Sequence, residues 1–287
     1  PAQPLYEPST AKTSNSPLVP QVNTGEIDPE RVSHIFSPDG ELAQNLPSYT
    51  TRSGQTEMAQ AIADAFNHRY HTMIEAGTGT GKSLAYLTPA ILWATQNNQR
   101  VVISTNTINL QDQLLHKDIP AVRSALGLDF RAVVLKGRSN YLSPHRLEIM
   151  RRRGPASALE LRTYAKILVW LLENQSGDRN EINLRGPGEN SVWYQLSAEN
   201  DDAATPDTDS PFARARRAAE NAHILIVNHA LLVSDALSEN QVLPEYGHVI
   251  IDEAHHLEAA ITYGLQVNID LQMLIRRLDN LGGPGTG

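Results

Sequence analysis

The sequence predicts an α/β fold in which helices cover both faces of a parallel sheet. Short apolar runs that do not alternate with polar residues, such as 101–104 and 132–135, are typical of strands buried on both faces. Segments with helical periodicity or helix-start signals lie between these runs. Of the 287 residues, 40% are hydrophobic and 20% are charged, which is ordinary for a globular protein.

The expected elements alternate along the chain. Asp28 and Pro29 indicate the start of a short helix that runs through Ile35. Further helices are expected at 55–66, 82–96 and 108–115, and strands at 72–76, 101–104, 132–135, 224–227 and 249–251. Residues 140–172 have a helical pattern, and 174–209 are expected to form a polar loop region. The sheet therefore resumes only after a mostly helical insertion of roughly 85 residues.

Composition excludes several classes of site. The sequence has no cysteine, which excludes disulfides, thiolate zinc sites, Cys-ligated iron–sulfur clusters and cysteine nucleophiles. No apolar run approaches the roughly 20 residues that span a bilayer, and the N-terminus lacks a signal-peptide pattern, so we expect a cytoplasmic protein with no membrane partner.

Charge is unevenly distributed within a formal net charge of −8. Twelve basic and five acidic residues lie between Arg100 and Lys166. Such a basic block is compatible with a phosphate-contacting surface, and Arg151, Arg152 and Arg153 are candidates for it. A solvated basic helix face explains the same pattern equally well.

A glycine-rich loop, AGTGTGKS at 76–83, follows one expected strand and opens one expected helix. Apart from Ala76 in place of the first glycine, it matches a phosphate-binding loop, in which backbone N–H groups and the helix N-terminus face a triphosphate. In that pattern Lys82 reaches the β- and γ-phosphates and Ser83 holds Mg²⁺. The expected nucleotide-binding residues here are Gly77, Thr78, Gly79, Thr80, Gly81, Lys82 and Ser83.

A second motif, Asp252-Glu253-Ala254-His255, ends the expected strand at 249–251. If this strand lies near the glycine loop, Asp252 is placed to hold the Mg²⁺ of a nucleotide. Glu253 can then orient and deprotonate an attacking water. The two motifs together indicate an ATPase site with Lys82, Asp252 and Glu253 among its catalytic residues.

On these motifs the chain resembles the N-terminal motor half of superfamily 2 DEAH-box helicases, most closely the DinG/XPD family of 5′→3′ DNA helicases, over about residues 28–281. The resemblance implies a P-loop NTPase (RecA-like) fold, adenine recognition by Arg52 and Gln55, and a role for His255 in linking nucleotide state to DNA. Residues 104–107 and 110–114 resemble the motif that contacts single-stranded DNA, 136–142 the start of an iron–sulfur insertion, and 227–232 the return to the motor domain. The expected DNA contacts are Thr105, Thr107, Gln111 and Arg138.

The chain departs from the family pattern in the insertion, where four cysteines should hold a [4Fe–4S] cluster. Ser143 and Ser210 stand where two of them are expected, and a serine hydroxyl is a poor substitute for a thiolate. We therefore expect no iron–sulfur cluster and an insertion held by packing. The family's second motor domain, which completes the ATP site, lies downstream of the residues present.

The expected organisation has five segments: a disordered lead-in (1–27), the first part of motor domain 1 (28–135), the insertion (136–221), the second part of motor domain 1 (222–267), and the start of a further helical insertion (268–287). The expected function is an ATP-dependent DNA helicase, of 5′→3′ polarity by resemblance. Its cofactors are ATP and Mg²⁺, and its partner is single-stranded DNA or DNA with a single-stranded tail. Two alternatives remain: a nucleotide- or DNA-binding module without turnover, and the motor part of a nuclease-fused helicase.

Overall fold

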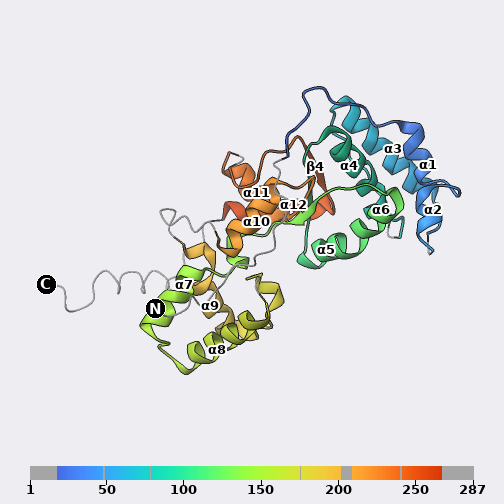
Figure 1. The fold of residues 1–287 in the computed structure, drawn as a ribbon. Helices are drawn as coiled ribbons and strands as arrows, with labels where there is room; N and C mark the ends of the chain where they lie inside the picture. The colour runs from blue at the N-terminus through green and yellow to red at the C-terminus, as the bar shows by residue number, and fades with distance from the viewer. Residues whose placement is uncertain are drawn as a thin grey trace.

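In a computed structural model, described for residues 18–266 except 48, 78, 175, 202–208 and 240, the sheet is parallel throughout. Its four strands are β1 (Val101–Thr105), β2 (Ala132–Val134), β3 (Ile224–Asn228) and β4 (His248–Ile251), in the order β2-β3-β1-β4. Helices surround this sheet (Figure 1). The predicted α/β class is confirmed.

Strand β1 is fully buried at the centre of the sheet. Val101 aligns with Ile224 of β3 on one side and with His248 of β4 on the other. Because all the strands are parallel, their carboxyl ends lie at the same edge, and the residues that follow β1, β3 and β4 are brought together there.

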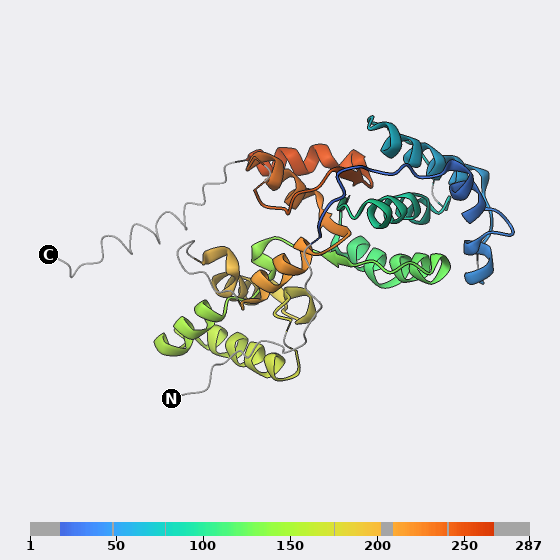
Figure 2. The ribbon, with the colours of Figure 1, turned by 45° about the horizontal axis from the view of Figure 1, so that its top comes forward.

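Alternate residues of the strands bury against different helices. Val101, Ile103, Ile224 and Ile226 belong to a core formed with α1 (Pro29–Ile35), α2 (Glu41–Asn45), α3 (Ser53–His68), α4 (Lys82–Asn97) and α6 (Ile119–Leu126). Val102, Leu225 and Val227 pack on the other face with α10 (Pro211–Glu220) and α11 (His229–Leu237). A short helix α5 (Ile108–Gln113) follows β1, and α12 (Leu257–Leu265) follows β4 (Figure 2). This two-sided burial explains why the strands are continuously apolar.

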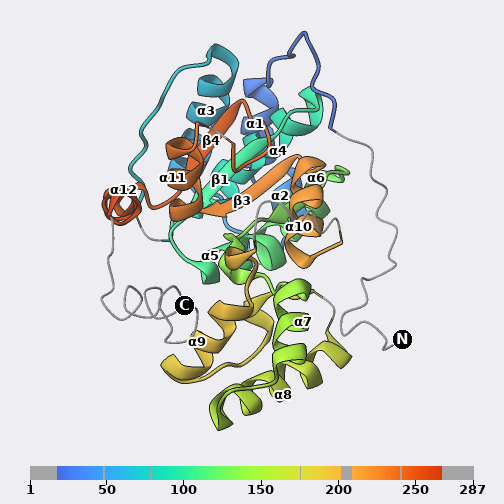
Figure 3. The ribbon, with the colours of Figure 1, turned by 90° about the vertical axis from the view of Figure 1, so that its left-hand side faces the viewer.

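The insertion has its own hydrophobic core. Helices α7 (Pro144–Arg153), α8 (Ala158–Glu173) and α9 (Gly186–Leu196) bury Leu147, Ile167 and Trp193 against one another, away from the sheet (Figure 3). The polar region 174–209, expected to be a loop, contains α9 and 3₁₀ turns at Arg179–Glu181 and Ala198–Asn200. This expectation was wrong because a few apolar side chains, such as Val192 and Leu196, suffice to anchor a largely polar segment.

The strand expected at 72–76 does not form. The segment is assigned no strand, and Met73 is 97% exposed while only Ile74 packs against the core. No described strand pairs with it, so the segment lacks the ladder hydrogen bonds that define a strand.

Residues 18–27, which belong to the lead-in expected to be disordered, are ordered, and this corrects the prediction for them. Residues 1–17 lie outside the described part of the chain. Asn97 at the C-terminal end of α4 accepts the Gly25 N–H (2.7 Å) and donates to its carbonyl (3.2 Å). Asn67 makes the same pair of bonds with Ile27, which is buried. The two side-chain amides thus make the backbone hydrogen bonds that a neighbouring strand would otherwise make. The composition of residues 18–27 alone does not indicate these contacts. Residues 268–287 also lie outside the described part, and within that part no helix has the length and apolar composition to cross a membrane.

Replacing Asn97 with Ala should loosen residues 18–27. The side chain is fully buried and makes two backbone hydrogen bonds, so we expect the free energy of unfolding to fall by about 1–3 kcal/mol. Chemical denaturation measures the loss, and amide exchange at Gly25 should accelerate. The control is Asn109→Ala on the exposed side of α5, expected within about 0.5 kcal/mol of the parent. Equal stability of the two variants would contradict the tether.

Candidate nucleotide-binding site

The glycine loop leads into α4 as expected. Gly79 and Gly81 both have left-handed backbones, with φ of 79° and 81°, and Gly81 is the N-cap of α4. The Lys82 ammonium donates to the Ala76 carbonyl (3.3 Å), and the Thr80 hydroxyl donates to the Gly77 carbonyl (2.9 Å). The side chain of Lys82 thus lies against the glycine loop. Thr78 lies outside the described residues.

Gln55 on α3 contacts this loop directly. Its side chain is 1% exposed, and its amide nitrogen donates to the Gly81 carbonyl (2.8 Å). The other amide atom, Oε1, is buried without a hydrogen-bond partner among the described residues. Arg52 lies at the same place, since a Cβ on Gly81 would approach its guanidinium to 3.6 Å. The structure thus brings Arg52, Gln55 and Gly81 together.

Asp252 follows β4 at the carboxyl edge of the sheet. Its backbone N–H donates to the Ser104 carbonyl (2.9 Å), which continues the pairing with β1 by one residue. One carboxylate oxygen accepts the Glu253 N–H (3.0 Å), and the other accepts the Tyr86 hydroxyl of α4 (3.0 Å). A hydrogen bond between α4 and the end of β4 therefore joins the two sequence motifs.

Glu253 has a strained backbone. Its φ of 54° is unusual for a residue other than glycine, and it turns the chain from β4 into a 3₁₀ turn at Ala254–His256. The turn is held by the Asp252 carboxylate on the Glu253 N–H and by the His256 N–H on the Glu253 carbonyl (2.9 Å). Backbone strain of this kind persists only where its surroundings hold it, and it is frequent at functional sites.

Tyr86 is the site residue that sequence analysis missed. It is 1% exposed, and burial, followed by the negative charge of Asp252, raises its pKa, so its hydroxyl stays protonated and donates. The sequence feature that could have identified it is a tyrosine four residues after Lys82, in a helix whose other buried positions are mostly apolar.

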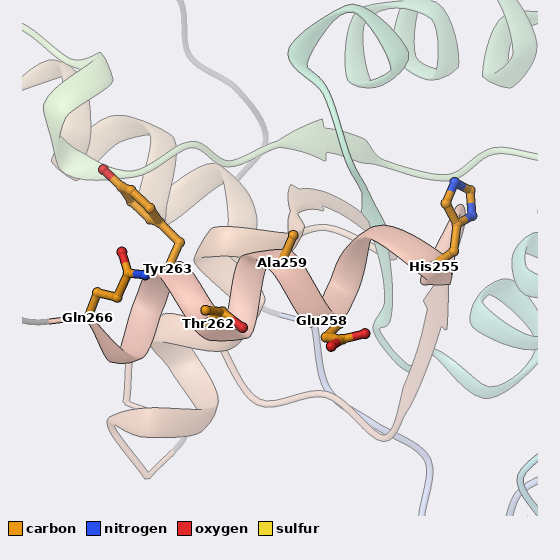
Figure 4. A pocket seen from close by; sticks show the side chains of 6 residues that line it. All are labelled: His255, Glu258, Ala259, Thr262, Tyr263 and Gln266. Carbon is orange, nitrogen blue, oxygen red and sulfur yellow. The ribbon is translucent and has the colours of Figure 1, made fainter.

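His255 is exposed and stacks against His256, with ring centroids 4.1 Å apart. Figure 4 shows it at the start of α12, beyond which Glu258, Ala259, Thr262, Tyr263 and Gln266 line a surface groove. Its expected role in linking nucleotide state to DNA stays a prediction.

The expected DNA contacts differ in exposure. Thr107 is exposed and caps α5, and Arg138 is exposed, with its guanidinium 5.3 Å from the centre of the Phe212 ring. Thr105 and Gln111 are buried: Thr105 ends the central strand, where its hydroxyl donates to the Thr107 carbonyl (3.2 Å), and Gln111 is 1% exposed. Of the four expected DNA-contacting residues, only Thr107 and Arg138 have exposed side chains in this conformation.

Arginines of the basic block are engaged in ion pairs. Arg151 and Arg152 both donate to Glu148, and their hydrogen bonds lower the pKa of Glu148 to about 2. Arg153 pairs with Glu160 (3.0 Å). This pairing favours the solvated helix face over a dedicated phosphate site.

Ser143 and Ser210, at the expected cysteine positions, are helix caps. Ser143 accepts the Arg146 N–H at the start of α7 (3.0 Å) and donates to Asp201 (2.6 Å). Ser210 accepts the Ala213 N–H at the start of α10 (3.2 Å). Serine is among the best residues for this purpose, so both positions have a structural use without a metal.

Replacing Gly81 with Ala should damage the site specifically. The positive φ costs about 1 kcal/mol of stability, and the added Cβ would also lie 2.2 Å from the Gln55 amide nitrogen. Gly127 is a matched control, since its φ is 61° and a Cβ there meets nothing within 4 Å. We expect Gly127→Ala to lose stability only, and Gly81→Ala also to bind fluorescent ADP about tenfold more weakly or worse. Equal ADP affinity in the two variants would argue against the Gln55–Gly81 contact as part of the site.

Comparison with known proteins identifies a family for the chain. A family model described as DEAD/DEAH box helicase matches residues 53–154. The chain is 36% identical to 3′-5′ exonuclease DinG of Bacillus subtilis (84% of this chain, 26% of the relative). It is 35% identical to ATP-dependent DNA helicase YoaA of Haemophilus influenzae (79% and 36%) and 38% identical to ATP-dependent helicase DinG of Mycobacterium tuberculosis (82% and 39%). It thus spans 26 to 39% of the length of these relatives. The chain belongs to the DEAD/DEAH-box helicases, in the group that contains DinG and YoaA.

Proposed function

We propose that the chain is the first motor domain of an ATP-dependent DNA helicase that translocates 5′→3′ on single-stranded DNA. The observation that carries the proposal is the hydrogen bond between Tyr86 and Asp252, because it places the acidic motif beside the helix that the glycine loop opens. The sheet combines β1 and β2 from the expected segment 28–135 with β3 and β4 from the expected segment 222–267, and the acidic motif follows β4.

The residues present fit Mg·ATP. Gly77 and Gly79 leave open space where a side chain would stand, as a loop that cradles phosphates requires. The unpaired Oε1 of Gln55 is an acceptor for the amino group of adenine, with Arg52 beside it. Ser83 and Asp252 supply the oxygen ligands that Mg²⁺ prefers, and bound Mg²⁺ would neutralise phosphate charge.

Lys82 and Glu253 have separate roles in this proposal. Lys82 donates to a neutral carbonyl, which it can exchange for the more strongly accepting phosphate oxygens. Glu253, held just beyond Asp252, orients and deprotonates the attacking water.

The DNA-binding part of the proposal has support from the central strand. Thr107 is exposed two residues beyond the end of β1, and Asp252 hydrogen bonds to Ser104 of the same strand. A shift of the acidic turn on hydrolysis would therefore act on the segment that presents Thr107 to DNA. Arg138, at the start of the insertion, is the other exposed candidate for contact with DNA.

A relative named as an exonuclease supports a second candidate, the motor part of a nuclease-bearing protein. Among the described residues, no group of three or more His, Asp or Glu side chains is arranged to hold a metal ion. Degradation of end-labelled DNA by the protein with its full natural sequence tests this candidate.

We expect Lys82→Ala and Glu253→Gln to abolish ATP hydrolysis in the chain extended through its natural downstream sequence. Lys82→Ala should also lose ATP binding, whereas Glu253→Gln should retain it because only the base for water is removed. The measurement is the Mg·ATP hydrolysis rate with and without single-stranded DNA, beside equilibrium nucleotide binding. Unchanged rates in either variant would refute the assignment, and ATP binding without turnover in the parent would favour the binding module.

The purified protein should contain no stoichiometric iron. Two of the positions that would ligate a cluster carry serine caps, and the insertion has a hydrophobic core of its own. Metal analysis and the visible absorption spectrum of anaerobically purified protein test this. About four iron atoms per chain, with a thiolate-to-iron absorption band, would overturn it.

A further inference from the structure

One buried hydroxyl contacts Asp252, which is one of the two residues expected to hold the magnesium ion. The Tyr86 hydroxyl donates to one oxygen of the Asp252 carboxylate (3.0 Å). The other expected ligand, Ser83, lies three residues before Tyr86 on the same face of α4. Asp252 follows the end of β4.

The hydroxyl is not needed for packing. Tyr86 lies in the core with Leu87, Ala90 and Ile91, where a phenylalanine ring would fill the same space. A buried hydroxyl is costly unless it is hydrogen-bonded, and the partner of this one is the Asp252 carboxylate. The position of Tyr86 thus indicates a task at the site.

The same contact fixes the orientation of Asp252. One carboxylate oxygen is taken by the Glu253 N–H and the other by Tyr86, so rotation of the carboxylate would break both hydrogen bonds. Each oxygen still has a lone pair, which leaves the carboxylate able to accept from a further ligand.

We propose that Tyr86 is a positioning residue that fixes the orientation of the Asp252 carboxylate before Mg·nucleotide arrives. This inference rests on the proposed ATPase function and adds a residue to it. Groups that orient metal ligands in this way are typically worth 10- to 100-fold in metal affinity.

The test is Tyr86→Phe in the protein with its natural downstream sequence. Binding of fluorescent ADP is measured against Mg²⁺ concentration and again in EDTA. We expect the Mg²⁺ concentration for half-maximal effect to rise about 10-fold or more, with ADP affinity in EDTA unchanged. Hydrolysis should show the same shift in its Mg²⁺ dependence, with a much smaller change in kcat at saturating Mg²⁺. A parental Mg²⁺ dependence in the variant would overturn the inference.

Two controls separate this role from a general effect. Tyr164→Phe removes another buried hydroxyl, on α8 in the insertion, and should leave the Mg²⁺ dependence unchanged. Asp252→Asn alone should weaken the dependence of ADP binding on Mg²⁺. Adding Tyr86→Phe to this variant should weaken that dependence little further, because Tyr86 acts through Asp252. Fully additive losses would overturn the inference.

Failure of the proposed function has a different signature. If Lys82→Ala abolishes nucleotide binding while Tyr86→Phe leaves the Mg²⁺ response unchanged, the ATP site is supported and the proposed role of Tyr86 is refuted. If the parent protein shows no Mg²⁺-dependent nucleotide binding, both the proposed function and the role of Tyr86 are refuted.

Discussion

Strand β1 pairs with a parallel neighbour on each side, and this double pairing determines where the functional groups can lie. It aligns the end of β1 with Asn228 of β3, and one further hydrogen bond, from the Asp252 N–H to the Ser104 carbonyl, aligns the acidic turn. The Ser104 hydroxyl also shares a hydrogen bond with the buried ring of His229 (2.7 Å), at the start of α11. The acidic turn and the segment that carries Thr107 are therefore both connected to the end of β1. Because β1 is fully buried, we expect it to move together with both of them.

The acidic turn illustrates how a strained backbone is maintained. A left-handed glutamate costs of the order of 1 kcal/mol or more, and three hydrogen bonds to Asp252 and Glu253 offset that cost. One of them, from Tyr86, comes from the helix that begins at the glycine loop. The geometry of the turn therefore depends on α4 being in place, and the two motifs form one structural unit although they are far apart in the sequence.

Local sequence predicted the four strands of the sheet to within a residue or two, because runs of apolar residues are sufficient to mark strands buried on both faces. It failed where a distant partner decides the outcome. The segment 72–76 has the apolar residues expected of a short strand before a glycine loop, but no described strand lies beside it. The polar, Pro-rich composition of the lead-in predicts disorder for residues 18–27, whereas the amides that hold them, on Asn67 and Asn97, lie at the ends of two helices elsewhere in the chain. Tyr86 was missed for the same reason: its partner is 166 residues away.

Among the described residues, the two ends of the insertion lie close together. Its first and last parts touch, with the ring of Tyr141 5.7 Å from that of Phe212 and Gly177 packed so closely against Pro211 that a side chain would not fit there. Helix α10, the last part of the expected insertion 136–221, packs on the sheet and leads the chain to β3, which pairs with β2. Segments with a core of their own, whose ends lie close together, tolerate insertion and exchange. In evolutionary terms, we expect the part of the insertion that precedes α10 to accept changes of length and content while the register of the sheet is kept.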